Sequence, residues 1–142
     1  KEAIEKIPEN QSIASKNIKS QVEFFSTFFE RAPAVIALSM EDYETVLEKG
    51  VTISHQDINI LRNYPDIQSA GAVIENILLA AVDMGYGGCW LSAPMMAKES
   101  LEEMIGIEEP FHLIAFVAVG VPANEVKPKG KKPLEEIFKL LE

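Results

Sequence analysis

The sequence contains little cysteine and little histidine. Its 142 residues include one cysteine, Cys89, and two histidines, His55 and His112. A single cysteine excludes an internal disulfide framework and fits a reducing compartment, so a cytoplasmic location is expected. These three residues do not have the spacing of a zinc site, and no metal is expected.

The common catalytic signatures are also missing. None of the patterns GxSxG, HExxH, CxxC or GxxxxGK[ST] occurs. Gly85, Gly87 and Gly88 lie between a predicted helix and a predicted strand, which is the reverse of the order that places a phosphate at a helix N-terminus. No acid, base or nucleophile is evident from these patterns.

Positive charge is scarce. The sequence has 13 Lys and Arg against 22 Asp and Glu, a formal net charge of −9. Nucleic acid and anionic membranes need a basic surface, so neither is expected as a partner. The longest apolar region, residues 70–90, is interrupted by Glu75, Asn76 and Asp83, so neither a membrane span nor a signal peptide is predicted.

The length and the 47% hydrophobic content predict one domain, residues 1–142, with its own core. Residues 1–30 are predicted to be helical, with an apolar side over residues 18–29 that is buried or part of an interface. Pro33 ends this helix. The continuous apolar run at residues 34–38 predicts an interior strand.

The next part of the sequence is less regular. Residues 41–48 predict a short helix that stops at Gly50. Residues 51–64 are polar and aperiodic, which predicts a loop with one helical turn. This loop is either solvated surface or faces a substrate, and His55 is the histidine placed to touch that substrate.

An apolar helix follows, which we expect Asp66 to cap and Gly85 to end. Gly87 and Gly88, like Gly85, are expected to permit positive φ. The apolar stripe nearly surrounds this helix, which favours a subunit interface, and Glu75 is interpreted as an interface hydrogen-bonding group.

The last part of the chain predicts two strands and two helices. A strand at residues 89–91 would bury Cys89 as an inert thiol, and a tight turn follows at residues 92–94. We further expect a helix at residues 98–105 stopped by Gly106, a strand at residues 112–119 with a structural His112, and a helix at residues 134–141 opened by Pro133. The order of elements predicts a layered α/β or α+β domain.

The segment KPKGKK, Lys127–Lys132, is the only basic cluster. It is either a solvated linker or a clamp in which ammonium groups meet the phosphate of an anionic cofactor.

Four stretches of sequence, in this order and spacing, resemble the C-terminal part of the nitroreductase family of flavin-dependent oxidoreductases. They are residues 66–94 with ENILLAAVDMGYGGCWL, LEEMIGI at 101–107, IAFVAVGVP at 114–122 and KKPLEE at 131–136. Each stretch is weak by itself, whereas the ordered set is fairly specific. Residues 1–65 agree with the family only in outline.

The resemblance implies an α+β fold in which helices flank a mixed, mostly antiparallel sheet, and an intertwined homodimer with FMN sites at its interface. It implies an enzyme that passes hydride from NAD(P)H through FMN to an electron-poor small-molecule acceptor such as a nitroaromatic or a quinone. Residues Trp90, Leu91, Ser92 and Ala93 match the segment beside the flavin ring, with the Ser92 backbone near ring atom N5. Lys129 and Lys131 match positions that reach the FMN phosphate.

The family's Arg-x-Ser-x-Arg segment and its Pro-Ser-x-x-Asn-x-Gln-Pro-Trp stretch are not found in this sequence. We therefore expect an N-terminally incomplete record of a longer protein, or a chain that binds FMN poorly. Two alternatives stay open. One is a non-catalytic flavin-binding or dimerisation module, and the other is a relative of the same fold that fragments flavin or dehalogenates aromatic substrates.

Overall fold

The computed structural model describes residues 13–50, 52–125 and 129–140. The predicted helical start at residues 1–12 and the basic residue Lys127 lie outside this part of the chain. The elements, in chain order, are α2 (Ile13–Thr27), η1 (Phe28–Arg31), β1 (Ala34–Glu41), η2 (Val46–Lys49), α3 (His55–Leu61), α4 (Pro65–Asp83), β2 (Gly87–Leu91), η3 (Ala93–Ala97), α5 (Lys98–Ile105), β3 (Phe111–Gly120) and α6 (Leu134–Ile137).

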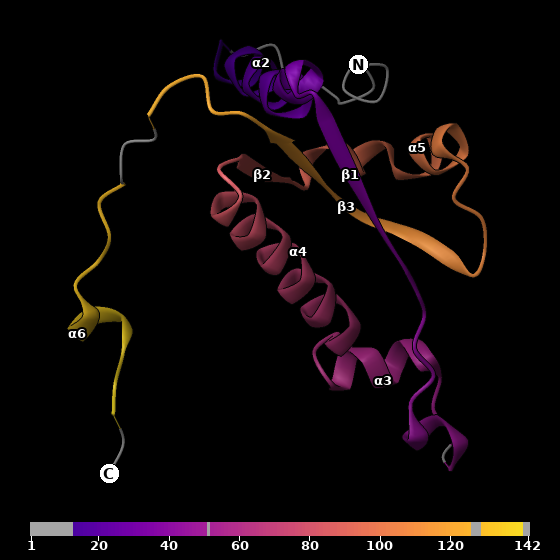
Figure 1. Cartoon of the computed structure of the whole chain (residues 1–142). Helices are drawn as coiled ribbons and strands as arrows, with labels where there is room; N and C mark the ends of the chain where they lie inside the picture. Colours follow the sequence, from indigo (N-terminus) through magenta and orange to yellow (C-terminus); the bar gives the residue numbers. More distant parts are fainter. Residues whose placement is uncertain (1–12, 51, 126–128, 141–142) are drawn as a thin grey trace.

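The three strands form one sheet in the order β1-β3-β2 (Figure 1). β3 pairs antiparallel with both neighbours, and Phe116 is level with Ala37 of β1 and with Leu91 of β2. β1 and β2 therefore run in the same direction, and both end at the same end of the sheet. Helices flank this sheet, so the predicted α+β class is confirmed; the described strands pair only antiparallel.

The core has two layers, one on each face of β3. On one face, Ile74 of α4 packs with Ala115 and Val117. On the other, Leu113 and Phe116 join Leu91, Met95 and Leu101. Residues two apart on a regular strand share a face, but Leu113 and Ala115 face opposite layers because the β1–β3 register shifts between Leu38 and Ser39. This irregularity places Leu113 in the same layer as Phe116 and Leu91.

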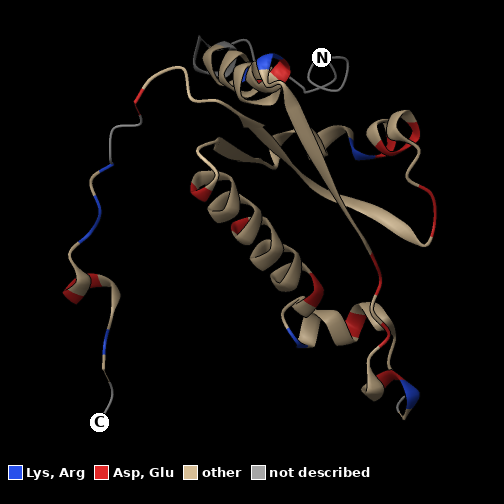
Figure 2. Ribbon diagram, in the orientation of Figure 1, with Lys and Arg blue, Asp and Glu red and all other residues tan. Residues whose placement is uncertain are grey.

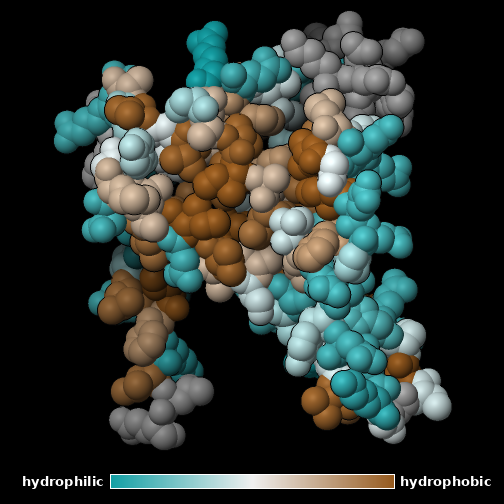
Figure 3. Space-filling model, turned by 45° about the vertical axis from the view of Figure 1, so that its right-hand side comes forward, coloured by the Kyte–Doolittle hydropathy of each residue, from teal (hydrophilic) through white to brown (hydrophobic). Residues whose placement is uncertain are grey.

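The predicted apolar helix is confirmed as α4, and Gly85 ends it with φ 81°. Only part of its apolar surface is covered: Ile74 is fully buried, whereas Leu79 and Val82 are 60% and 67% exposed. Figure 3 shows apolar side chains gathered in one continuous area in the upper middle of that view. Glu75 is exposed to solvent in the single chain.

Several predictions for the first half were wrong. β1 is an edge strand, with Val35 and Ile36 exposed, because an apolar run does not reveal whether both faces are covered. The helix predicted over residues 41–48 is only the short turn η2, since β1 continues to Glu41.

Within residues 51–64, where a loop with one helical turn was expected, His55–Leu61 form a complete helix, α3. Its N-cap is Ser54, whose side chain accepts from the Asp57 N–H. Asp66 is not the cap of α4. That helix starts at Pro65, and Tyr64 takes the cap position in a left-handed conformation with φ 55°. Pro65 suits a first helical position because it needs no N–H donor there.

The second half was predicted more closely, with three corrections. Cys89 is exposed, because β2 is the other edge of the sheet. Of Gly85, Gly87 and Gly88, only Gly85 has positive φ, since Gly87 and Gly88 belong to β2. Helix α6 ends at Ile137, earlier than expected, and Pro133 is its N-cap. In the described part of the chain, no helix combines the length and apolar character needed to cross a bilayer.

Candidate functional site

The end of strand β2 presents two side chains to opposite faces of the sheet. Leu91 is 3% exposed and packs in the same layer as Phe116. Trp90 is 46% exposed, and its ring lies over Gly71 of α4. The buried Leu91 side chain anchors the strand, so Leu91 can offer a ligand only its backbone.

Main-chain donors are available just beyond β2. Ser92 is exposed and opens the short helix η3, and its carbonyl accepts from the Met95 N–H at 3.0 Å. The N–H groups of Ser92 and Ala93 enter none of the backbone hydrogen bonds of the described turns. We call this pair the Ser92–Ala93 rim. It can donate hydrogen bonds to the edge of a planar ligand.

The two predicted phosphate-binding lysines are distant from this rim in the single chain. Lys129 and Lys131 are exposed and belong to the segment between β3 and α6. Figures 1 and 2 show this segment running away from the sheet and the other helices, with its basic positions along it. One chain alone does not bring the two predicted parts of the FMN site together.

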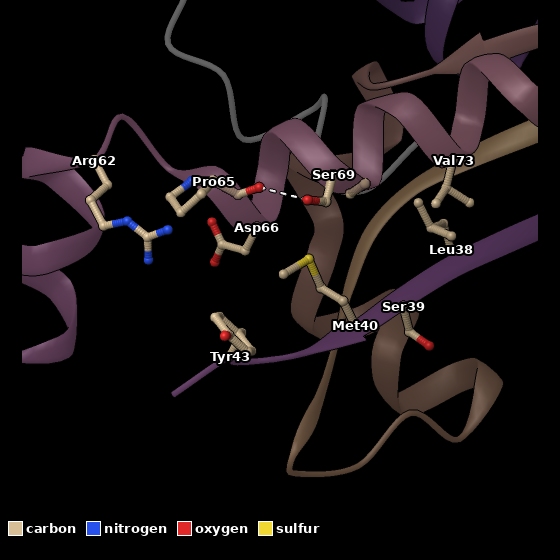
Figure 4. A pocket seen from close by; sticks show the side chains of 10 residues that line it. Leu38, Ser39, Met40, Tyr43, Arg62, Pro65, Asp66, Ser69 and Val73 are labelled. Atoms are coloured by element: carbon tan, nitrogen blue, oxygen red, sulfur yellow. Dashed lines mark hydrogen bonds between the residues drawn. The ribbon is translucent and has the colours of Figure 1, made fainter. Parts of the chain in front are cut away.

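A hollow of about 460 Å³, which the sequence did not predict, lies between the end of β1 and the junction of α3 with α4 (Figure 4). Its lining is mostly apolar, with two charged side chains, and consists of Leu38, Ser39, Met40, Tyr43, Arg62, Pro65, Asp66, Ser69, Ala70 and Val73. Tyr43 and Arg62 also line a second, more open hollow next to it. The only signal in the sequence was the alternative that residues 51–64 face a substrate.

His55 lies in a hydrogen-bonded network beside this hollow. Its Nδ1 is 3.0 Å from Glu48 Oε2, and its Nε2 is 2.8 Å from Asn59 Nδ2. In the neutral ring, Nδ1 donates to the carboxylate and Nε2 accepts from the amide. The Asn59 amide also donates to Asp66 Oδ2 over 3.4 Å, which connects the network to a wall of the hollow.

The network changes the pKa of both partners of its ion pair. The hydrogen bond to Glu48 raises the pKa of His55, and the nearby charges of Asp42 and Asp66 act in the same direction. The Thr45 backbone N–H, followed by His55, lowers the pKa of Glu48. Both shifts favour the charged forms, as expected for hydrogen-bonded opposite charges.

Asp42, His55 and Asp66 each place a potential metal-ligand atom within 4.8 Å of the others. Asp42 also lies 3.6 Å from Nδ1 of His112, so both histidines of the chain approach the same carboxylate. Both ring nitrogens of His55 already have partners in Glu48 and Asn59. These contacts satisfy the imidazole without a metal ion.

The nitroreductase family model matches residues 1–121 of the chain. The chain is 35% identical over 68 residues to an NADPH-dependent oxidoreductase of Staphylococcus haemolyticus, which covers 46% of this chain and 27% of that protein. It is also 35% identical over 57 residues to a Cr(VI) reductase of a Pseudomonas species, covering 39% of this chain and 24% of that protein. The matched segments thus span about a quarter of these two proteins.

Solved structures show the same fold. A BluB-like flavoprotein from Clostridium difficile superposes with a TM-score of 0.75 at 30% identity, covering 91% of this chain and 63% of that one. The NfrA1 nitroreductase from B. subtilis superposes with a TM-score of 0.63 at 17% identity, covering 97% and 62%. The chain therefore spans less than two thirds of each of these structures.

Proposed function

This chain belongs to the nitroreductase family, and we propose that it forms part of an FMN-dependent oxidoreductase that transfers hydride from NAD(P)H to an electron-poor acceptor such as a nitroaromatic or a quinone. The observation that carries this proposal is the Ser92–Ala93 rim, where two main-chain N–H groups just beyond β2 enter none of the backbone hydrogen bonds of the described turns. A flavin ring presents hydrogen-bond acceptors along its edge, so its chemistry fits such a rim.

Bound FMN would supply the hydride acceptance and donation. The residues of the chain hold and orient it. The pairing of β2 with β3 and the buried Leu91 side chain keep the rim rigid, so its donors need no reorganisation when charge develops on an acceptor atom. This division of roles agrees with a sequence that has no evident acid, base or nucleophile.

We propose that Lys129 and Lys131 bind the FMN phosphate through their ammonium groups. Because these lysines lie on a segment that leaves the sheet, a homodimer is part of the proposal: the segment of one copy reaches the rim of the other. Exposed apolar side chains support a second copy, among them Phe24 at 62% and Val82 at 67%, since a large exposed apolar patch marks an interaction surface.

We also propose that the enzyme is cytoplasmic and acts on small molecules. The net charge of −9 opposes binding to nucleic acid or to an anionic membrane. The thiol of Cys89 is exposed and without a disulfide partner, which suits a reducing compartment.

The test is an FMN titration of the purified chain, followed by anaerobic addition of NADPH. We expect a yellow protein that NADPH bleaches. Replacing both Lys129 and Lys131 with Gln should weaken FMN binding, whereas Lys139→Gln, an exposed lysine beyond α6, should leave it unchanged. Ser92→Ala should also bind FMN normally, because the proposed donor is the backbone.

The alternatives predict other outcomes. A yellow protein that NADPH does not bleach indicates a flavin-binding module or a relative with another flavin reaction. A protein that stays colourless with excess FMN overturns the flavin assignment. Sedimentation that shows only monomers, with FMN bound, contradicts the dimer.

A further inference from the structure

The hollow near Tyr43 lies at the end of the sheet where β2 reaches the Ser92–Ala93 rim. Leu91 is level with Ala37 across Phe116, and the next residue of β1, Leu38, is the first that lines the hollow. Since β1 and β2 run in the same direction, the chain leaves both strands at this end. The hollow and the rim therefore lie at the same end of the sheet, the hollow at the β1 edge on the side of α4 and the rim at the β2 edge.

The walls of the hollow are suited to a flat apolar body. Leu38 and Met40 come from β1, and Pro65, Ala70 and Val73 come from α4 on the opposite side (Figure 4). A volume of about 460 Å³ lies within the usual range for small-molecule sites, where apolar walls bury the ligand and a few polar groups orient it. One or two aromatic rings would fill this space.

Arg62 and Asp66 supply the polar groups. Figure 4 shows both side chains at the junction of α3 and α4, with Tyr43 approaching from the other side. Arg62 is the one cation of the lining, and its guanidinium has no hydrogen bond or ion pair with any described residue. Asp66 Oδ1 accepts from the Ile67 N–H at 2.8 Å, but Oδ2 has only the 3.4 Å contact from Asn59. The Arg62 guanidinium as donor and the weakly bonded Oδ2 of Asp66 as acceptor thus line the same hollow.

The charges select a neutral ligand. An anion would be attracted by Arg62 but repelled by Asp66 and by the nearby Asp42. A cation would be attracted by the two carboxylates but repelled by the guanidinium of Arg62, which would stay unpaired. A neutral group that accepts at one atom and donates at the next satisfies both side chains. A primary carboxamide and a cyclic imide have this pattern.

We infer that the hollow binds a small neutral aromatic compound whose carboxamide or imide edge accepts from Arg62 and donates to Asp66. That this compound is also the electron acceptor rests on the proposed function; the binding does not. Electron-poor rings commonly carry such groups, so the two properties are compatible in one molecule.

Binding is tested by calorimetry on the flavin-free chain with three probes of similar shape: 4-nitrobenzamide, N,N-dimethyl-4-nitrobenzamide and 4-nitrobenzoate. One net hydrogen bond is worth about 0.5–1.5 kcal/mol, so the primary amide should bind about 2- to 10-fold more tightly than the dimethyl amide. It should also bind more tightly than the benzoate. Arg62→Met and Asp66→Asn should each reduce this preference, and Val73→Phe, which narrows the hollow, should weaken all three probes.

Arg31→Met and Asp83→Asn are the matched controls, because both residues are exposed and lie outside the hollow. A tighter fit for the benzoate, no saturable binding of any probe, or an equal loss in the controls would overturn the assignment. If the amide binds with the expected preference but is not reduced in the presence of FMN and NADPH, the site stands and the proposed reaction fails.

Discussion

The ring of Trp90 lies against the backbone of Gly71: a β-carbon placed on Gly71 would be 3.5 Å from Trp90 Cη2. This contact brings helix α4 close to strand β2, next to the Ser92–Ala93 rim. It is an ordinary van der Waals distance for one added carbon and leaves no space for a larger side chain at position 71.

Gly71→Ala should keep the fold and stabilise it by up to about 1 kcal/mol, because glycine is a poor residue inside a helix. Gly71→Leu should displace Trp90 towards solvent. Trp90 is the only tryptophan, so its fluorescence reports the movement as a red shift in the leucine variant alone. Identical emission from both variants would contradict the packing described here.

Gly120→Ala should destabilise the protein by about 1–3 kcal/mol, as expected for overpacking. The added carbon would lie 2.8 Å from Pro33 Cδ and 3.2 Å from Cγ, and the proline ring cannot rotate away. Urea unfolding measures the loss. Gly130→Ala serves as the control, since nothing lies within 4 Å of its β-carbon position, and it should remain within about 0.5 kcal/mol of the wild type.

Glu102 holds the irregular part of β3. Its Oε1 accepts from the Leu113 N–H at 2.6 Å, close to the shift in register. Glu102→Ala should lower the free energy of unfolding by about 1–3 kcal/mol, because it leaves a buried donor unsatisfied. Glu102→Gln keeps an acceptor, so its free energy of unfolding should fall by less than that of Glu102→Ala. The exposed neighbour Glu103 is the comparison: a loss in Glu103→Ala as large as that in Glu102→Ala would show that the hydrogen bond is not the cause.

The His55–Glu48 pair should make stability depend on pH. The pKa of His55 is raised above 6.5, so its contribution is present below that pH and is lost as the pH rises through the folded-state pKa. The pKa of Glu48 is lowered from 4.5, so its contribution is present above 4.5 and is lost as the pH falls through the folded-state pKa. The pair therefore stabilises the folded state most at pH values between 4.5 and 6.5.

An NMR titration of the His55 ring should give a pKa above 6.5 that falls in Glu48→Gln. The stability difference between the wild type and this variant should be largest at a pH of about 5–6 and shrink in alkaline solution. Glu44→Gln changes an exposed carboxylate that pairs with Lys49, and it should leave the pKa of His55 unchanged. A His55 pKa that does not respond to Glu48→Gln would contradict the network.

Local patterns predicted the elements of the second half well. Helix α5 runs over Lys98–Ile105 as expected, and Gly106 stops it with φ 73°. Strand β3 follows its apolar run. These features depend on neighbours in sequence, on side-chain period and on the backbone freedom of glycine. For the same reason the Ser92–Ala93 turn could be located before any fold was known.

The sequence by itself determined α4, β2, α5 and β3, and the family to which the chain belongs, because both depend on the local order of residues. The tertiary structure decided that β1 and β2 are edge strands, that Cys89 is exposed, and that Leu113 and Ala115 serve opposite layers. It alone brought Tyr43, Arg62 and Asp66 around one hollow. Exposure and proximity of this kind depend on which elements cover one another. The periodicity of apolar residues along one segment does not show which distant segments will pack against it.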